Sequence, residues 1–493
     1  MDNEEQTISL SVIHNIEALR NLFGNNEQLT FHYFERDGEE PFGAIAYLKV
    51  LIDTEWLQQL ILPRIGERIQ WEEASTNSLI DAAKDQGITR VVPNLEDAVR
   101  IITDAGIVLF AENQIQAFGM SLPGFGKRSI KEPMMEVNVR GPRAGFIEDL
   151  DTNAGLIYRR LKTPQLKSKT FIVGQESRTN IMVLYLENQV NLSVLHEIES
   201  RLESVCLNVV VDSAQIEEWI QDSVYSPFSQ IQNTERPDRV ATALNQGKVA
   251  ILTDGSPNVL LAPAMFTDFL HPSEDLYEKF YFADFLRGLR IITLFVSLFL
   301  PSVYIALSTF HLEMIPTPLM LTFLSAKSGI PFPTILEALI MEIAFEILRE
   351  ASVRLPQTVG QSISIVGALI IGEAAVQSGI VSRSMVIIVA VTGIASFTIP
   401  SFNTAITLRL LRFPLMFIAA CTGVLGISLS MFALVLHLCS LRSFGTLFIP
   451  TPEPKHWRDF VSHFVLLPIK LRKFSKMQAS AVAAKGSEHD EEV

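Results

Sequence analysis

Acidic side chains gather in an otherwise apolar stretch of this sequence, residues 334–353. Glu342, Glu346 and Glu350 follow one another at steps of four residues, so a helix would carry them on one face. Carboxylates within a membrane helix are costly and are often functional. Two hypotheses stay open: an interfacial helix with ordinary salt bridges, or an acidic face that lines a cation path or holds a gate. The residues assigned to the second role are Glu337, Glu342, Glu346 and Glu373.

A stripe of small or polar side chains runs through residues 359–380 at steps of three or four. The rest of this span is mostly Ile, Val and Leu. Small residues permit close packing of membrane helices, and they also leave room for ions along a pore wall. Both interpretations stay open. Glu373 lies off the stripe, with Arg383 or a neighbouring subunit as its expected partner. The candidate pore-lining residues are Gln361, Ser364, Ala368, Gly372, Ala375 and Gly379.

Recognisable catalytic motifs do not occur in the sequence. GFGKRS at 124–129 departs from a phosphate-binding loop, because Ser121 replaces its first glycine and Arg128 replaces the Ser or Thr that holds magnesium. The nine histidines show no metal-ligand spacing. The three cysteines suggest neither a disulfide framework nor a metal site, and we expect them to be buried thiols. We therefore expect no enzyme activity, no metal and no cofactor.

The distribution of charge divides the chain into two parts. Residues 291–441 hold 12 charged residues among 151, about 8%, whereas the other 342 residues hold 82 of the 94 charges, about 24%. One part suits lipid and the other suits water, which excludes a secreted protein, a fibrous protein and a simple cytosolic enzyme. The net charge of −14 argues against a nucleic-acid partner.

The water-suited part predicts two similar α/β subdomains. A helix is expected over 53–63, ended by Pro63, and another over 94–104 with Asn94 as its N-cap. Residues of this first region recur at similar spacing further along the chain. Asp97, Val99, Gly106 and Val108 match Asp238, Val240, Gly247 and Val249 at a constant offset of 141 residues. Tyr47 and Leu48 match Tyr185 and Leu186 at an offset of 138 residues.

The apolar part predicts an α-helical multi-pass membrane domain. Residues 291–310 contain no charge and are long enough to span a bilayer, with basic Arg287 and Arg290 before them. Arg409 and Arg412 are expected between two further spans, 384–401 and 413–441. An even number of spans, four to six, would place both termini in the cytoplasm. The expected divisions are 1–139 and 140–285 for the subdomains, 286–441 for the membrane domain, 442–476 for a basic cytoplasmic tail and 477–493 for a disordered end.

Several long blocks resemble the A subunits of bacterial spore germinant receptors. They occur in the family's order and together cover roughly residues 140–454, with a looser likeness over 25–139. The blocks are RGPRAGFIEDLDTNAGLIYRRLKTPQL (140–166), TERPDRVATALNQGKVAILTDGSP (234–257), IPFPTILEALIMEIAFEILREASVRLP (330–356), IVGALIIGEAAVQSGIVS (365–382), LRLLRFPLMFIAACTGVLGI (408–427) and SFGTLFIPTPEP (443–454).

This resemblance implies a subunit of a nutrient receptor in the spore inner membrane, with its termini on the core side. The partners it implies are a permease-like B subunit, a lipoprotein C subunit, further copies of the chain, and membrane lipid. The family's A subunits are thought to form a ring that releases monovalent cations at the start of germination. An alternative hypothesis is a scaffold that relays nutrient binding without conducting ions. Glu373 stands where the family usually has glutamine, which adds one negative charge per subunit.

Overall fold

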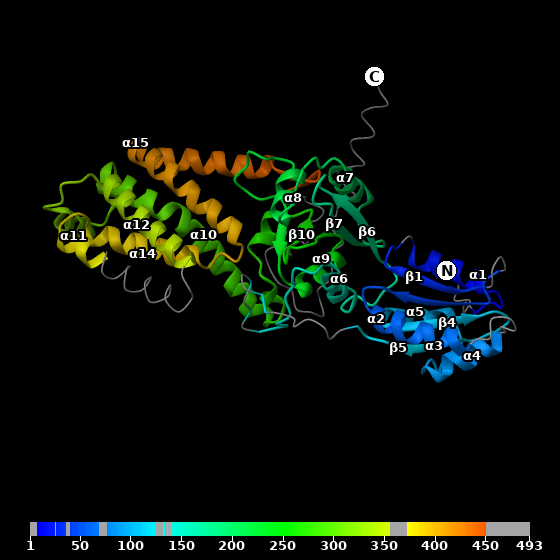
Figure 1. Ribbon diagram of the computed structural model, residues 1–493. Coiled ribbons are helices and arrows are strands. Elements are labelled where there is room, and N and C mark those ends of the chain that lie inside the picture. Colours follow the sequence, from blue (N-terminus) through cyan, green and yellow to red (C-terminus); the bar gives the residue numbers. More distant parts are fainter. Residues whose placement is uncertain are drawn as a thin grey trace, which may run out of the picture.

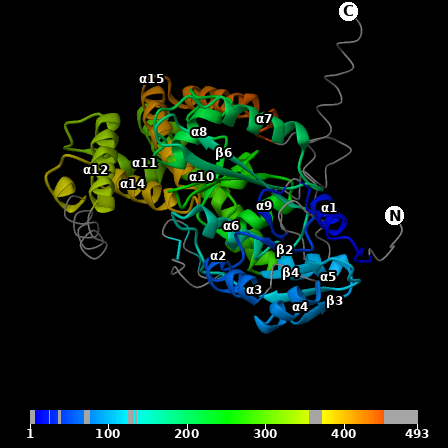
Figure 2. The ribbon, with the colours of Figure 1, turned by 45° about the vertical axis from the view of Figure 1, so that its right-hand side comes forward.

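The computed structural model describes residues 7–24, 26–35, 40–68, 76–124, 132–133, 136, 138, 140–354 and 372–449. Three parts follow one another: a first unit (7–124), a second unit (140–276) and a helical part (280–440). Figure 1 shows the second unit between the first unit and the helical part. In Figure 2, as in Figure 1, α11, α12 and α14 lie at the opposite end of the molecule from α3 and α4.

The first unit is a five-stranded antiparallel sheet in the order β1-β2-β4-β5-β3, with helices on both faces. Side chains of β2 alternate, so that Ala44 and Ala46 pack toward α1 and α5 while Ile45 and Tyr47 pack toward α3 and α4. Its elements are α1 (Val12–Phe23), β1 (Leu29–Phe34), β2 (Gly43–Leu48), α2 (Thr54–Trp56), η1 (Leu57–Ile61), α3 (Leu62–Arg68), α4 (Thr76–Asp85), β3 (Arg90–Val92), α5 (Leu95–Thr103), β4 (Gly106–Ala111) and β5 (Ala117–Ser121).

The second unit repeats this topology, with an antiparallel sheet in the order β6-β7-β9-β10-β8. The sequence matches fall on equivalent elements, since β2 ends at Leu48 and β7 at Leu186. The predicted similarity of the two subdomains is therefore confirmed in strand order. The elements are α6 (Leu150–Tyr158), β6 (Leu166–Val173), β7 (Thr179–Leu186), α7 (Leu192–Glu203), α8 (Ser213–Ile220), β8 (Gln232–Thr234), α9 (Pro237–Asn245), β9 (Val249–Thr253), β10 (Val259–Ala262), η3 (Phe266–Phe269) and η4 (Ser273–Leu276).

The two units share one continuous hydrophobic core. It joins the faces of both sheets that carry α1, α5, α6 and α9. At its edge the buried Asn26 side chain donates to the carbonyl of Leu166 at 2.8 Å and to the hydroxyl of Tyr158 at 3.1 Å. Its side-chain oxygen accepts from the hydroxyl of Ser168 at 2.8 Å. Asn26 thus fixes the loop before β1 onto the second unit.

Helix ends in the first unit show one correct and one wrong prediction. Asn94 caps α5 as expected, because its side-chain oxygen accepts from the backbone N–H of Asp97 at 2.7 Å. Pro63, in contrast, does not end the helix that begins at Thr54. The wider π turn of η1 precedes it, with the N–H of Leu62 bonded to the carbonyl of Leu57, and α3 continues to Arg68. A π turn changes the hydrogen-bond spacing in the turn before Pro63, where an α-helix would clash with the proline ring.

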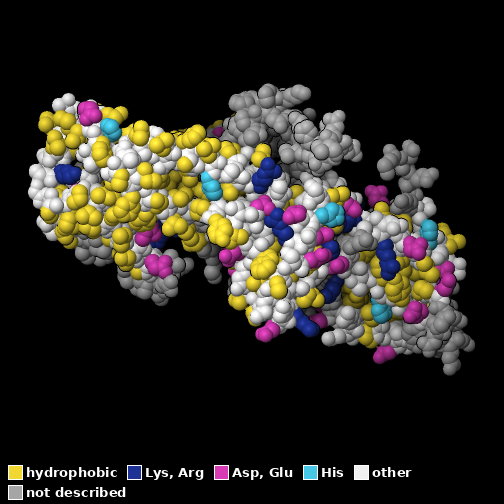
Figure 3. Space-filling view, turned by 90° about the horizontal axis from the view of Figure 1, so that it is seen from above, with side chains coloured by type: hydrophobic (Ala, Val, Ile, Leu, Met, Phe, Trp, Pro, Cys, Tyr) yellow, Lys and Arg dark blue, Asp and Glu magenta, His cyan; other side chains and the backbone are white. Residues whose placement is uncertain are grey.

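The helical part is the apolar portion of the chain. Two of its described helices, α10 and α15, are long and apolar enough to cross a membrane. Figure 3 shows hydrophobic side chains covering this part, whereas acidic and basic side chains gather over the two units. The elements are α10 (Phe280–Thr309), η5 (Leu312–Met314), α11 (Thr317–Lys327), α12 (Thr334–Arg354), α14 (Arg383–Ser396) and α15 (Phe402–Ser440), followed by β11 (Arg442–Ser443) and β12 (Thr446–Leu447).

Glycine 423 turns α15 back on itself. Its φ of 66° and ψ of −145° interrupt the helix in a region that essentially only glycine adopts. The first half of α15 therefore runs away from the second unit and the second half returns to it (Figure 1). The turn lies against the end of α10, where a Cβ on Gly423 would stand 3.0 Å from Nε2 of His311. We call this end of the helical part the far end, and the end beside the second unit the near end.

Both ends of the helical part meet the second unit. The first turns of α10 bind Asp275, and His437 near the end of α15 lies 3.0 Å from the hydroxyl of Ser226. Residues 442–449, the start of the expected basic tail, pack on the same unit, where the Ser443 hydroxyl donates to the carbonyl of Gln230 at 2.6 Å. The start of α10 and the end of α15 therefore lie on the same side of the helical part, beside the second unit.

Replacement of Asn26 tests the junction between the units. Asn26→Ala leaves the carbonyl of Leu166 and two hydroxyls without their amide partner, and we expect about 2–3 kcal/mol of destabilisation. The measurement is thermal unfolding of the purified full chain in detergent. Asn77→Ala, on the exposed side of α4, is the matched control and should leave the transition unchanged. Equal transitions for both variants would show that these hydrogen bonds do not hold the units together.

Candidate functional site

A buried ion pair joins three helices at the centre of the helical part. Arg412 of α15 donates to a carboxylate oxygen of Glu342 on α12 at 2.6 Å, and its Nε donates to the carbonyl of Ser297 on α10 at 2.9 Å. The exposed fraction is 0% for Glu342 and 1% for Arg412. Removing a charge from water is costly, so each of these groups requires the other.

Two further arginines extend this pair toward the near end. Arg409, one turn before Arg412 on α15, lies 3.0 Å from Glu346, one turn after Glu342 on α12. Arg349 lies 3.9 Å from Glu346 and donates to the hydroxyl of Ser396 on α14 at 3.0 Å. Its guanidinium also lies 4.5 Å from the ring centre of Phe397. We call Glu342, Glu346, Arg349, Arg409 and Arg412 the charged seam.

The seam corrects the expected position of two arginines. Arg409 and Arg412 do not lie between two spans, because α15 begins at Phe402 and contains both. Acids of α12 neutralise both guanidinium groups, and a main-chain carbonyl of α10 accepts a further hydrogen bond from Arg412, so the helix accommodates them. A hydropathy profile treats each residue separately and cannot register such a partner. The sequence did carry one signal, since acids four residues apart on one helix match arginines three residues apart on another.

The other predicted acids lie at the far end in different surroundings. Glu337 is 1% exposed and accepts from the backbone N–H of Ser382, just before α14, at 2.8 Å. Glu373 is exposed and accepts from the side chain of Gln377 at 3.0 Å. The partner of Glu373 in this structure is therefore Gln377 and not the expected Arg383.

The predicted stripe is described only in part. Residues 372–377 are helical, with Gly372 buried and Ala375 half-buried, and Gly379 follows in a turn with φ of 69°. Gln361, Ser364 and Ala368 lie outside the described residues. Their assignment to a pore wall, like the ion-path assignment of Glu337, Glu342, Glu346 and Glu373, stays a prediction.

The seam leaves some hydrogen-bonding capacity free. Among the described residues Oε1 of Glu342, Oε1 of Glu346 and Nη2 of Arg412 form no hydrogen bond, although all three atoms are buried. A buried polar atom without a partner is costly. These unpaired atoms therefore lower the stability of the seam in this arrangement of α10, α12 and α15.

A second polar cluster ties α10 to the second unit. Asp275 is 2% exposed and accepts from Nε of Arg287 at 2.9 Å and from both terminal nitrogens of Arg290 at 2.8 and 2.9 Å. The two arginines that flank the predicted span are thus fixed by protein. Bidentate pairs of this kind set direction as well as distance. These bonds therefore fix the orientation of the start of α10 on the second unit.

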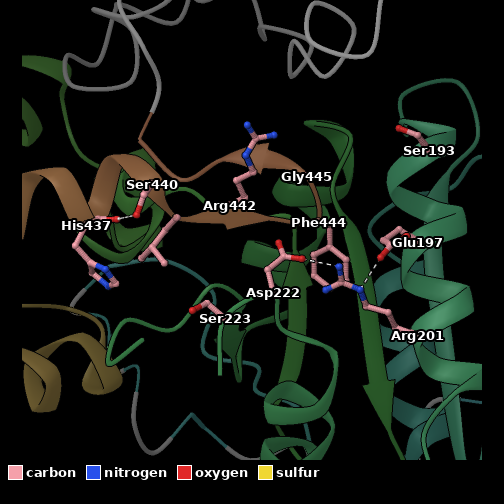
Figure 4. A pocket seen from close by; sticks show the side chains of 11 residues that line it. Ser193, Glu197, Arg201, Asp222, Ser223, His437, Ser440, Arg442, Phe444 and Gly445 are labelled. Carbon is pink, nitrogen blue, oxygen red and sulfur yellow. Dashed lines mark hydrogen bonds and ion pairs between the residues drawn. The ribbon is translucent and has the colours of Figure 1, made fainter. Parts of the chain in front are cut away.

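A pocket of about 770 Å³ lies between α7, the loop after α8 and the end of α15 (Figure 4). Arg201 donates to Glu197 at 2.8 Å and to Asp222 at 2.5 Å, and its guanidinium lies 4.8 Å from the ring centre of Phe444. Figure 4 shows the Arg442 side chain directed away from this group. Two carboxylates neutralise Arg201. Its contact with Phe444 holds the segment after α15 on the second unit.

The described residues contain no group of three or more His, Cys, Asp or Glu that could hold a metal ion. Cys206, Cys421 and Cys439 are unpaired, and they are exposed, contrary to the expected burial. Two of them lie on the outer surface of α15, where apolar surroundings would suit an exposed thiol as well as a core would. The expected absence of enzyme activity and of a cofactor stays a prediction.

Comparison with known families decides the relationship of the chain. Residues 17–477 match the model of the Bacillus/Clostridium GerA spore germination protein. The chain belongs to this family. Relatives from Bacillus subtilis strain 168 include "Uncharacterized membrane protein YfkQ", 42% identical over 95% of this chain and 91% of the relative, and "Spore germination protein KA", 38% identical over 91% and 82%. "Spore germination protein GerLA" of Bacillus cereus is 35% identical over 93% of each chain.

A solved structure also matches part of this GerA family member. It is the crystal structure of the N-terminal domain of the A subunit of the Bacillus megaterium spore germinant receptor GerK3. The match covers 54% of this chain and 99% of that domain, at 22% identity and a TM-score of 0.40. The family resemblance predicted from the sequence blocks is confirmed by the family model and the relatives.

Neutral substitutions test the central ion pair. Either Glu342→Gln or Arg412→Gln alone leaves an uncompensated buried charge, and we expect each to cost about 3–5 kcal/mol. The double variant removes both charges and should cost clearly less than the sum. Thermal unfolding of the full chain in detergent, with membrane levels checked by blot, measures this coupling. The exposed Arg383→Gln is the control, and strict additivity of the two single effects would contradict a direct pair.

Because of His271, we expect the stability of the second unit to depend on pH. Burial, followed by the positive charge of Arg287, lowers the pKa of His271 to about 3. Because the unfolded chain binds the proton more readily, stability is complete above about pH 6.5 and is lost as the pH falls toward 3. We expect about 1 kcal/mol less stability at pH 5.5 than at pH 7.5 from this residue. The unfolding free energy is measured at pH 5.5 and at pH 7.5. The His271→Asn variant should lose this difference in stability, whereas a variant of the exposed His196, His196→Asn, should keep it.

Proposed function

We propose that this chain is the A subunit of a nutrient receptor in the spore inner membrane and forms an oligomeric, nutrient-gated path for monovalent cations. Membership of the GerA family supports the role in germination. The length and apolar character of α10 and α15 support a helical part that crosses the bilayer. In this arrangement the two units lie on the core side, together with the residues that follow α15.

The charged seam is the observation that carries the proposed gating role. It joins α12, which precedes the predicted pore segment 359–380, to α15 and α10. α10 in turn is fixed to the second unit through Asp275. A displacement of the second unit by a partner would therefore act on the seam and, through α12, on the pore segment. Gating needs such an element with two arrangements.

The partners follow from the same proposal. A permease-like B subunit would bind the nutrient, and a lipoprotein C subunit would complete the receptor. Several copies of this chain would form the ring around the ion path. An even number of membrane spans, as proposed from the sequence, would place both ends of the helical part on the side of the two units.

The ion pairs of the acids on α12 favour an alternative function, that of a scaffold subunit. Glu342 and Glu346 each form an ion pair with an arginine, which offsets the negative charge that would attract a cation. A scaffold subunit that relays nutrient binding to other germination proteins, without conducting ions, would use the seam only to transmit movement. A bulky residue on the predicted pore stripe would block ion release from a channel subunit but not from a receptor in which this chain is only a scaffold.

Potassium release tests the conduction path. Cells expressing this chain with its two partner subunits are exposed to nutrient, and released potassium is measured while membrane levels are checked by blot. Ala368→Trp, on the predicted stripe, should abolish release because the indole fills a narrow path. Ala374→Trp, which lies off the stripe on an exposed surface, is the matched control and should release normally.

A further arm and the contrary outcome complete the experiment. Glu373→Gln removes one negative charge per subunit and should change the preference between cations. Normal release and unchanged preference in correctly inserted Ala368→Trp and Glu373→Gln variants would contradict the conduction path and favour the scaffold.

A further inference from the structure

The loop between α8 and β8 exposes apolar side chains beside the helical part. Tyr225 has an exposed fraction of 101% and Val224 of 55%. Neither residue contributes to the hydrophobic core clusters of the second unit. Full exposure of an aromatic side chain next to a valine has a free-energy cost in water, because both apolar surfaces stay hydrated.

The same loop is fixed between α10 and α15 by its next three residues. The hydroxyl of Thr407 donates to the carbonyl of Pro227 at 2.5 Å, and the hydroxyl of Ser226 lies 3.0 Å from Nε2 of His437. Phe228 is 3% exposed and packs within the core cluster of the helical part that includes Leu294 and Leu298. The position of the loop along these helices is therefore set by the fold.

These contacts define the level of Tyr225 relative to the apolar span of α10. On α15, Thr407 binds the carbonyl of Pro227 and stands five residues before Arg412, which binds the carbonyl of Ser297 on α10. Five helical residues rise about 7.5 Å, so Pro227 lies at the level where the uncharged stretch of α10 begins, at Ile291. Tyr225 precedes Pro227 by two residues, which is at most about 7 Å of chain. It consequently lies near the level at which α10 enters its apolar span. In a membrane this level is the boundary between headgroups and hydrocarbon, where Tyr is enriched because its ring is apolar and its hydroxyl is polar.

We propose that Val224 and Tyr225 form a lipid-docking surface, with which the second unit rests in the interfacial layer of the bilayer that α10 and α15 cross. This inference rests on the proposed membrane crossing of the helical part. A lipid occupant fits better than a protein, since a stable protein interface buries about 800 Å² per partner. One aromatic side chain buries only about 150–250 Å². Docking would hold the second unit against the membrane as well as against α10.

Site-directed spin labels test the docking surface in the full chain. Cys206, Cys421 and Cys439 are replaced by serine, and single cysteines are introduced by Tyr225→Cys, Val224→Cys, Leu429→Cys and Ile172→Cys. Labelled protein is reconstituted in phosphatidylethanolamine–phosphatidylglycerol vesicles. Collision rates with oxygen, which concentrates in lipid, and with a water-soluble nickel complex are then compared. Leu429 on α15 and Ile172 on β6 are exposed by 61% and 70% and serve as controls for lipid and for water.

We expect the labels at 224, 225 and 429 to collide mainly with oxygen and the label at 172 mainly with nickel. If the label at 429 favours oxygen while those at 224 and 225 are as accessible to nickel as that at 172, the docking surface is wrong and the membrane crossing stands. If the labels at 224 and 225 are shielded from both reagents, a protein covers the loop, which also overturns the proposal. If the label at 429 favours nickel, the membrane crossing itself fails, and docking fails with it.

Discussion

The buried pair of Glu342 and Arg412 is the interaction on which the helical part depends. Neither charge has access to water, so α12 and α15 must stay in register for each to neutralise the other. The carbonyl of Ser297 brings α10 into the same contact. Three helices of a largely apolar part are thus held by direction-dependent bonds, whereas apolar packing alone would permit them to slide.

This constraint extends outward through polar contacts toward the second unit. Arg409 and Glu346 continue the seam by one turn, and Arg349 adds α14. Asp275 fixes the start of α10, while Ser443 and Phe448 bring the chain after α15 onto the same unit. The second unit and the seam are therefore connected through the start of α10 and through the chain that follows α15.

The two units have the same topology and pack against each other. Both sheets have the same strand order, and their facing helices share one core. Among the described residues, the first unit packs against the second unit, and the second unit packs against the helical part (Figure 1). Polar groups such as Asn26 determine how the two units sit against each other, since apolar contacts by themselves have little directional preference.

The sequence by itself determined the division into water-suited and apolar parts and the helix capped by Asn94, because charge distribution and caps are local properties. The family was identified from the resemblance of several long sequence blocks. The sequence also indicated that Glu342 and Glu346 share a helix face. Only the tertiary structure decided that Arg412 and Arg409 neutralise them, that α15 turns at Gly423, and that the helix after Thr54 continues past Pro63. Pairing partners 63 and 70 residues apart depend on how helices pack, and that information is not present in any single segment of the chain.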